Sequence, residues 1–247
     1  MLSFVKDFIK TKPILYDFFN SYRVLDDELE QWIDQYSKSH NRPINFIQVG
    51  ASDGLRWDPI RRFIVRDKWK GVLVEPLKPV FEILVENYSY LKNDDLKFEN
   101  CAISGQDTQI DIWTYSPGFL KDLSIEEKLF YLRKSSLDKG QVEKHLEEIE
   151  NRDNFLKCYE TNSRPLEEII EQYFSDKIID LIFIDAEGFD DQVIRTINFN
   201  KCKPRSIVYE NHSLGEKNKA IEEFLSEKGY ETKIINGDTV ASYNSNN

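Results

Sequence analysis

INFIQVGASDG, residues 44–54, is the stretch that decides the fold of this chain. Its apolar first half predicts a buried β-strand, which runs into a turn containing Gly50 and Gly54. A second apolar run at 72–74 ends in Glu75, which follows Gly54 by 21 residues. In an open α/β sheet, ligands bind beyond the carboxyl ends of the strands, where backbone N–H groups are free. The glycines permit a close approach of the backbone and Glu75 could accept hydrogen bonds from two ribose hydroxyls, so the two motifs predict a nucleoside cofactor.

The spacing of the glycines indicates which nucleoside is bound. Dinucleotide sites use G-x-G-x-x-G, in which the middle glycine lets the backbone meet a pyrophosphate, whereas this chain has only G-x-x-x-G. Asp53 lies within the turn, where a carboxylate repels a pyrophosphate but attracts a cation, such as the amino or sulfonium group of S-adenosylmethionine (SAM). The turn therefore favours SAM over NAD. A glycine turn alone, or an acidic strand end alone, can occur in any βαβ unit. It is the two motifs together, at this spacing, that indicate a nucleoside site.

The composition predicts a single large α/β domain without a nucleic-acid partner. With 247 residues, of which 40% are hydrophobic, the chain can bury one sizeable core. A net charge of −11 opposes DNA or RNA binding, because proteins that bind nucleic acids carry a basic surface. A basic cluster at 56–70 could face an acidic substrate, but we interpret it as a solvated helix face.

The cysteines and the N-terminal residues bear on the location of the protein. Cys101, Cys158 and Cys202 show no paired spacing, which favours reduced thiols and a cytoplasmic location. Charges interrupt the apolar residues of the first ten positions, so we expect neither a signal peptide nor a transmembrane segment. An amphipathic helix that packs on the domain is the expected use of this segment.

Residues 1–43 are predicted to form an N-terminal helical cap, and residues 44–247 the main domain. From Ile44 onward, short apolar strands alternate with amphipathic helices, which is typical of βαβ units and a mostly parallel sheet. The expected strands are 44–49, 72–75, 97–103, 109–115, 179–184, 206–210, 231–235 and 239–243. The expected helices are 55–67, 79–91, 165–174, 189–197 and 216–228.

The end of the chain specifies the topology further. Asn236-Gly237-Asp238 is a turn signal that predicts a terminal antiparallel hairpin. A mostly parallel sheet with such a hairpin is the class I, Rossmann-like topology of SAM-dependent methyltransferases. Between about 116 and 160 a polar helical insertion interrupts this core, either as a wall of the site or as a solvated excursion.

Two further strand ends carry candidate catalytic residues. DAEGFD at 185–190 follows one expected strand, and ENH at 210–212 follows the next. Methyl transfer requires alignment of the acceptor and removal of its proton, for which one histidine or carboxylate suffices. His212 is the first candidate base because imidazole titrates near neutrality, and Asp185 is the second. Each residue could instead have a purely structural role. His212 could hydrogen-bond a neighbouring loop, and Asp185 could cap the N-terminus of a helix.

The same strand ends have other interpretations. A divalent cation, Mg²⁺ or Mn²⁺, could be held by side chains of Asp185, Glu187, Asp190, Glu210 and His212. Their spacing matches no metal motif, and carboxylates in the first turn of a helix explain part of the pattern, so we rank metal-free catalysis higher. Asn100 follows the third strand, where it either pairs with the adenine edge or satisfies a turn.

In this order, the motifs resemble the FkbM family of SAM-dependent methyltransferases. The resemblance covers about residues 44–212 and rests on VGASDG at 49–54, VEP at 74–76, NCAIS at 100–104 and IDAEG at 184–188. It implies a class I fold, SAM as the methyl donor, and O-methylation of a hydroxyl on a sugar, polysaccharide or natural product. The family's acidic motif corresponds to Asp185 and Glu187. Its strand end with an acidic residue and a histidine corresponds to residues 210–212. Its cofactor motif falls on Gly50, Asp53 and Glu75, and the expected cofactor contacts are Gly50, Ala51, Asp53, Gly54, Glu75, Asn100 and Asp185.

The sequence therefore predicts an O-methyltransferase that acts on a small molecule or glycan. One alternative is a SAM-binding interaction module without catalysis. A less favoured alternative is an NAD(P)-dependent oxidoreductase, which the missing middle glycine opposes. The aromatic residues of the cap indicate self-association into a homo-oligomer.

Overall fold

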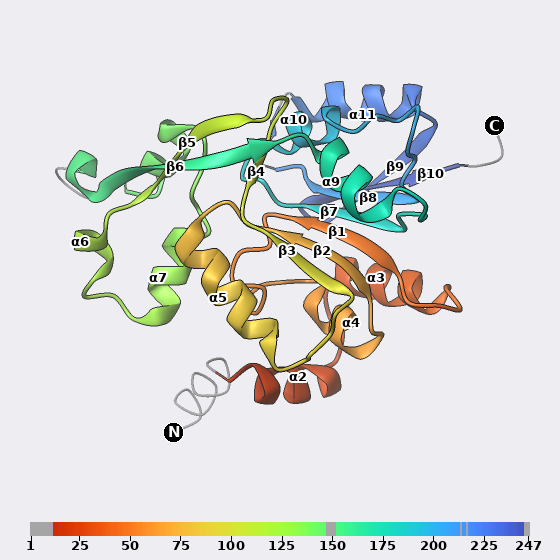
Figure 1. Cartoon of the computed structure of the whole chain (residues 1–247), viewed down its shortest axis with the longest axis horizontal. Coiled ribbons are helices and arrows are strands. Elements are labelled where there is room, and N and C mark those ends of the chain that lie inside the picture. Colours follow the sequence, from red (N-terminus) through yellow and green to blue (C-terminus); the bar gives the residue numbers. More distant parts are fainter. Residues whose placement is uncertain (1–11, 147–151, 213, 216, 245–247) are drawn as a thin grey trace.

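The computed structural model describes residues 12–146, 152–212, 214–215 and 217–244. A seven-stranded sheet forms its centre, in the order β3-β2-β1-β7-β8-β10-β9 (Figure 1). The first five of these strands are parallel, and β10 runs antiparallel to both β8 and β9. The strands are β1 Asn45–Val49, β2 Lys70–Val74, β3 Leu96–Glu99, β7 Leu181–Ile184, β8 Ser206–Glu210, β9 Tyr230–Ile235 and β10 Asp238–Tyr243. This is the predicted class I arrangement, including the terminal hairpin.

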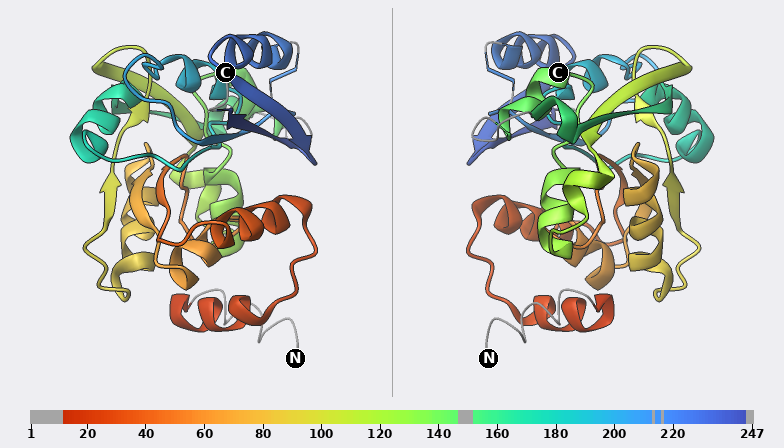
Figure 2. Two further views of the ribbon diagram at one scale, coloured as in Figure 1. Left: turned by 90° about the vertical axis from the view of Figure 1, so that its right-hand side faces the viewer. Right: turned by 90° about the vertical axis from the view of Figure 1, so that its left-hand side faces the viewer.

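Helices cover both faces of this sheet. Alternate residues of β1 point into two cores, with Ile47 and Val49 in one and Phe46 in the other. The first core is closed by α9 Leu166–Phe174, α10 Asp190–Arg195 and α11 Lys217–Glu227. The second is closed by α3 Glu28–Lys38, α4 Arg61–Arg66 and α5 Lys78–Ser89. Figure 2 shows α2 and α3, in red, on the opposite side of the sheet from α11, in blue.

A second, three-stranded sheet lies beside the first, in the order β4-β6-β5. It consists of β4 Ala102–Ile103, β5 Thr108–Tyr115 and β6 Leu156–Arg164. Between β5 and β6 lie α6 Pro117–Leu120, α7 Ile125–Leu132, α8 Lys139–Lys144 and the short helix η1 Arg152–Phe155. The expected helical insertion at 116–160 is therefore helical only in its first part, and it returns as a strand that pairs with β5 along its whole length.

Two other expected elements differ from the structure. The strand expected at 97–103 is divided, because 96–99 pairs with β2 while 102–103 pairs with β6 in the other sheet. The helix expected at 55–67 begins only at Arg61. The Asp58 carboxylate accepts hydrogen bonds from the backbone N–H groups of Ile60 and Arg61, at 2.9 and 3.1 Å, and the residue before Pro59 is disfavoured in a helix. The preceding residues form a turn instead.

The cap packs on the main domain through a buried ion pair. Asp17 is the buried residue of α2 (Pro13–Tyr22), and its carboxylate receives two hydrogen bonds from Arg61 of α4, at 2.8 and 2.9 Å. Leu29 and Ile33 of α3 lie in the same core as Phe46 of β1, so this core includes both cap and sheet. The division at residue 43 stays a prediction. The first eleven residues, expected to form a helix, lie outside the described part of the chain.

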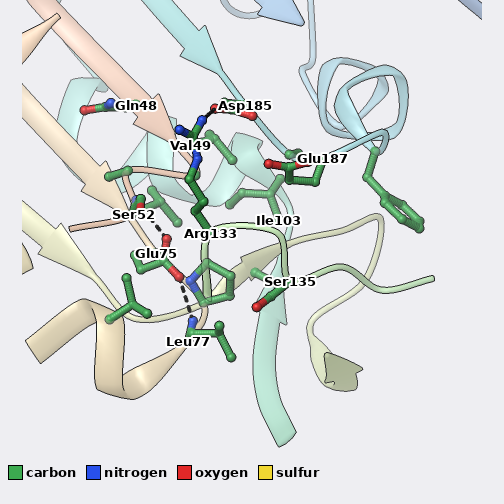
Figure 3. Close-up of a pocket in the computed structure, with 18 of the residues that line it drawn as sticks. Gln48, Val49, Ser52, Glu75, Leu77, Ile103, Arg133, Ser135, Asp185 and Glu187 are labelled. Carbon is green, nitrogen blue, oxygen red and sulfur yellow. Dashed lines mark hydrogen bonds and ion pairs between the residues drawn. The ribbon is translucent and has the colours of Figure 1, made fainter. Parts of the chain in front are cut away.

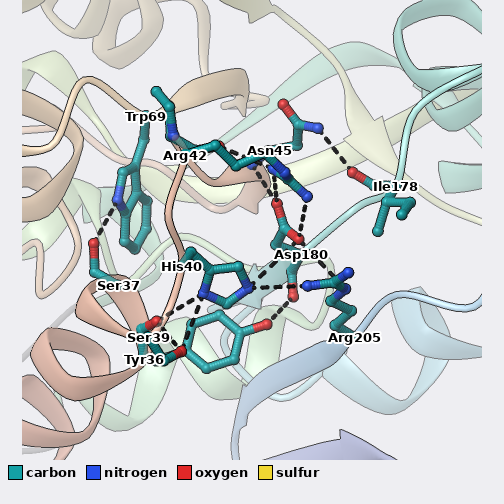
Figure 4. A network of polar contacts seen from close by, with 11 residues as sticks. Tyr36, Ser37, Ser39, His40, Arg42, Asn45, Trp69, Ile178, Asp180 and Arg205 are labelled. Carbon is teal, nitrogen blue, oxygen red and sulfur yellow. Dashed lines mark hydrogen bonds and ion pairs between the residues drawn. The ribbon is translucent and has the colours of Figure 1, made fainter. Parts of the chain in front are cut away.

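A second polar network joins the end of the cap to the amino edge of the sheet (Figure 4). Asp180, which is fully buried just before β7, accepts two hydrogen bonds from Arg42 at 2.7 and 2.9 Å and one from the Asn45 N–H at 2.8 Å. The Tyr36 hydroxyl donates to the Asp180 carbonyl at 2.7 Å. This network fixes the entry of the chain into β1, at the opposite edge of the sheet from the motifs at 50–54 and 185–190.

Candidate functional site

A pocket opens at the carboxyl ends of β1, β2 and β7 (Figure 3). Its lining includes residues 48–52, 74–77, 101–103 and 185–187. Residues 132–133 and 135–137, from the segment between β5 and β6, form part of its wall. The insertion therefore serves as a wall of the site, one of the two interpretations that the sequence allowed.

Gly50 brings three strand ends together. The backbone N–H groups of Gly50 and Ala51 both donate to the Val74 carbonyl, at 3.0 Å. Gly50 has φ +77°, and a Cβ at this position would lie 1.9 Å from the Asp185 carbonyl oxygen. No side chain fits there, so the glycine is required by the approach of β1 to β7. Gly54 lies outside the pocket lining: a Cβ on it would lie 2.3 Å from Leu84 of α5.

Glu75 lies at the centre of the pocket, next to the glycine turn. Its carboxylate accepts hydrogen bonds from the backbone N–H groups of Ser52 and Leu77, both at 2.9 Å. These contacts point the side chain across the end of β1 (Figure 3). Burial raises the pKa of Glu75 to about 7, against the opposing effect of the two N–H groups. The structure thus brings Glu75 together with Gly50 and Ala51.

Asp53 and Asn100 both have local hydrogen-bond partners. The Asp53 carboxylate accepts from the backbone N–H groups of Leu55 and Arg56 and pairs with the Arg56 guanidinium at 2.6 Å. Its charge is therefore paired within the turn, and its contact with a ligand cation stays a prediction. The Asn100 amide donates to the carbonyls of Glu75 and Pro76, at 2.8 and 3.1 Å. Neither residue lines the pocket, and this geometry favours the turn interpretation of Asn100.

Two carboxylates of the loop after β7 do line the pocket. Asp185 is half-buried, and its Oδ2 lies 3.7 Å from the Arg133 guanidinium. Its Oδ1 is buried and has no hydrogen-bond partner among the described residues. Burial and the nearby charge of Glu210 raise the pKa of Asp185. Glu187 pairs with Lys134 at 2.8 Å, and burial raises its pKa to about 7.

The next strand end is arranged differently. Asp190 is fully buried and accepts hydrogen bonds from the backbone N–H groups of Ala186 and Glu210, at 3.3 and 3.1 Å, so it joins the ends of β7 and β8. The His212 Nε2 lies 3.1 Å from Oε1 of Glu210, but the His212 side chain is 64% exposed and lines neither pocket. Of the two candidate bases, only Asp185 faces the pocket.

The proposed metal ligands do not converge. In the part of the chain that the structure describes, no three His, Cys, Asp or Glu side chains are placed to hold a metal ion. Glu187 forms an ion pair with Lys134, and the Asp190 carboxylate accepts hydrogen bonds from two backbone N–H groups. The structure therefore does not assemble Asp185, Glu187, Glu210 and His212 into a ligand set.

A second pocket adjoins the first on the side of the cap. Six residues line both pockets: Trp57, Asp58, Pro59, Arg133, Phe183 and Asp185. The remaining lining comes from the cap (Tyr16, Asn20, Arg23, Asp27, Leu29 and Glu30) and from the carboxyl edge of the sheet (Glu210 and Asp238). Asp185 thus stands where the two pockets meet.

Sequence reasoning missed three residues that line these pockets. Asp58 was expected inside a helix, and Arg133 inside an insertion of unknown placement. Gln48 was read as an ordinary strand residue, although a polar side chain in an apolar run was a signal that could have identified it. No pattern in the sequence indicates that Arg133 folds back onto Asp185.

Comparison with known proteins gives one family and several distant structures. The model of the methyltransferase FkbM domain matches residues 48–232. No curated protein matches the chain. The solved structures that it resembles include a putative caffeoyl-CoA O-methyltransferase from Staphylococcus aureus (12% identity, 92% of this chain and 88% of that chain, TM-score 0.49). They also include methyltransferase FkbM from Methylobacillus flagellatus KT (12% identity, 87% of this chain and 50% of that chain, TM-score 0.47). A third is an RNA methyltransferase from Salinibacter ruber, solved with S-adenosyl-L-homocysteine (12% identity, 89% of this chain and 92% of that chain, TM-score 0.40).

Proposed function

The chain belongs to the FkbM family of methyltransferases, and from this premise we propose that it transfers the methyl group of SAM to a hydroxyl of a sugar, polysaccharide or natural product. Membership makes the chain a SAM-dependent methyltransferase. The choice of a hydroxyl acceptor, and hence a role in carbohydrate modification, is the proposal. In the described residues no helix is long and apolar enough to cross a membrane. We also propose a cytoplasmic location, which the three free cysteines support.

The first pocket is the proposed cofactor site. Glu75 is buried beside the glycine turn, where its carboxylate would accept hydrogen bonds from the ribose hydroxyls. The backbone around Gly50 and Ala51 would frame the methionyl end, and the side chains at 101–103 would contact the adenine. When bound, SAM supplies a methyl group that its sulfonium already activates.

The meeting of the two pockets at Asp185 is the observation that carries the proposal. Methyl transfer needs the acceptor oxygen aligned with the donor methyl and its proton removed. An acceptor in the second pocket would reach the first pocket past Asp185, whose Oδ1 has no partner within the described residues. Burial raises the pKa of Asp185, which makes it a stronger base than an exposed carboxylate. His212, beside Glu210 at the rim, is the second candidate.

The proposal is tested first by calorimetric titration with SAM, S-adenosylhomocysteine and NADH. We expect the two SAM-related ligands to bind and NADH not to bind. Glu75→Gln should weaken SAM binding by about 5–150-fold, which corresponds to loss of about 1–3 kcal/mol. Glu82→Gln, on the exposed surface of α5, removes the same charge and should leave the affinity unchanged. Binding of NADH in place of SAM would contradict the proposal.

Turnover is then measured as S-adenosylhomocysteine release with a panel of sugars, in EDTA and in Mg²⁺ or Mn²⁺. Asp185→Asn should lower kcat by about 100-fold or more while the Kd for SAM stays within a few fold. Unchanged turnover in this variant would move the proton-accepting role to His212, which His212→Ala tests in the same way. SAM binding without release in the presence of any hydroxyl acceptor would favour the interaction module.

A further inference from the structure

We infer that the second pocket is the acceptor site and that it is built for an acceptor carrying an ammonium group beside its hydroxyls, such as an amino sugar. The inference rests on the proposed function and deepens it by naming the class of acceptor. It is carried by the charge balance of the pocket, by its buried oxygen atoms and by the spacing of its carboxylates.

Negative charge exceeds positive charge in this pocket. Two arginines line it, and both already face carboxylates: Arg23 pairs with Asp26 and Glu30, and Arg133 lies 3.7 Å from Asp185. No lysine contributes to the lining formed by the described residues. Six carboxylates line the pocket: Asp27, Glu30, Asp58, Asp185, Glu210 and Asp238. A cationic ligand would offset this excess, whereas an anionic ligand would increase the repulsion.

Two buried oxygen atoms without partners lie on residues that line the pockets. Asp185 Oδ1, on a residue that lines both pockets, has no hydrogen-bond partner among the described residues, whereas Asp58 is hydrogen-bonded by the Gln48 side chain. Oε1 of Gln48, a residue that is only 3% exposed and lines the first pocket, also has no partner among the described residues. A buried acceptor without a partner costs about 1–3 kcal/mol, so these atoms favour a ligand that brings N–H and O–H donors.

The spacing of the carboxylates argues against a single metal ion. No three of them converge in the described chain. They come from separate elements, with Asp27 and Glu30 on the cap and Glu210 and Asp238 at the edge of the sheet. Several separate acceptors suit a ligand with several separate donors, which is the chemistry of a polyhydroxylated amine. The Trp57 ring, 50% exposed, adds an aromatic surface between the pockets.

SAM itself does not account for this charge. Asp27, Glu30, Glu210 and Asp238 line the second pocket and are absent from the lining of the first. Burial and the charges of Asp185 and Glu210 raise the pKa of Asp238 to about 7, and an ammonium group of a ligand beside this carboxyl would favour its charged form. His212 is the nearby group whose positive charge opposes this rise.

The test compares three β-1,4-linked trisaccharides that differ at carbon 2. The glucosamine trimer carries ammonium groups, cellotriose carries hydroxyls, and the N-acetylglucosamine trimer carries neutral amides. Each is titrated calorimetrically into the full-length protein saturated with S-adenosylhomocysteine, at pH 7 and low salt. We expect the glucosamine trimer to bind at least roughly tenfold more tightly than either neutral trimer.

Two variants locate the effect. Asp238→Asn should remove most of the preference for the ammonium trimer, whereas Asp107→Asn, an exposed position outside both pockets, should leave it unchanged. Equal affinities for the three trimers, or no binding of the glucosamine trimer, would overturn the inference. The preceding titration with S-adenosylhomocysteine reports on the proposed function separately, because a failure there is visible before any sugar is added.

Discussion

Gly50 is the residue on which the geometry of the site depends most directly. A Cβ there would lie 1.9 Å from the Asp185 carbonyl oxygen, and the backbone has φ +77°. We expect Gly50→Ala to lower the free energy of unfolding by about 2–5 kcal/mol, since left-handed strain and overpacking add. Urea denaturation measures this change. Gly105→Ala is the matched control, because nothing lies within 4 Å of its Cβ position. Equal stability of the two variants would show that the strand ends can separate without cost.

Glu75 makes the stability of the protein depend on pH. Its pKa is raised from an ordinary value of 4.5 to about 7, chiefly by burial. Between these values the folded protein holds a proton that the unfolded chain has lost, so this residue's contribution to stability falls as pH rises. Glu75→Gln removes the effect.

The measurement is the free energy of unfolding of both proteins, from pH 5 to pH 8, without ligand. The wild type should lose stability relative to Glu75→Gln, with a slope difference that approaches about 1.4 kcal/mol per pH unit. The other buried carboxyls are common to both proteins, so their effects largely cancel. Parallel curves, or a wild type that gains relative stability with pH, would contradict the raised pKa.

Among the secondary-structure elements, α2 is attached to the main domain by a buried ion pair. Arg61 is completely buried and makes two hydrogen bonds with Asp17 of α2. Arg61→Met should cost about 3–5 kcal/mol, because it leaves the Asp17 carboxylate buried without its cation. The double variant with Asp17→Leu should recover part of the loss. Lys70→Met, in an exposed pair with Asp95, should cost at most about 1 kcal/mol. Strictly additive losses in the Asp17 and Arg61 variants would show that the two residues act independently.

The elements that the sequence predicted well are those whose burial is dictated by the main sheet. β1, β2, β7 and β8 are apolar runs enclosed by helices on both faces, and such runs indicate parallel strands without further context. β6 was missed because it is mostly half-buried and polar, LKCYETNSR, so its strand conformation depends on pairing with β5. The division of 97–103 between two sheets has no signature within a single strand.

Over the whole molecule, the backbone of the site could be predicted more fully than its side-chain contacts. Parallel topology places the carboxyl ends of β1, β2 and β7 at one edge, so Gly50, Glu75 and Asp185 were expected together. The ion pair of Asp53 was not foreseen, because its partner Arg56 is only three residues away and the turn brings the two side chains together. The second pocket requires the cap to fold against the sheet, and this distant contact leaves no local pattern.

Because segments from most of the chain line the two pockets, ligand binding should stabilise the molecule as a unit. At a SAM concentration 100-fold above Kd, the gain in the free energy of unfolding is about 2.7 kcal/mol. For a chain of this length that gain raises the Tm by about 5–10 °C, which differential scanning calorimetry measures. Glu75→Gln should show a smaller shift at the same SAM concentration, and Glu82→Gln the full shift. If the glucosamine trimer occupies a site separate from SAM, as the second pocket requires, then at 100-fold its own Kd it should add a second gain of about 2.7 kcal/mol and a comparable further rise in Tm. A further gain of only about 0.4 kcal/mol, close to RT ln 2, would show instead that the two ligands compete for one pocket.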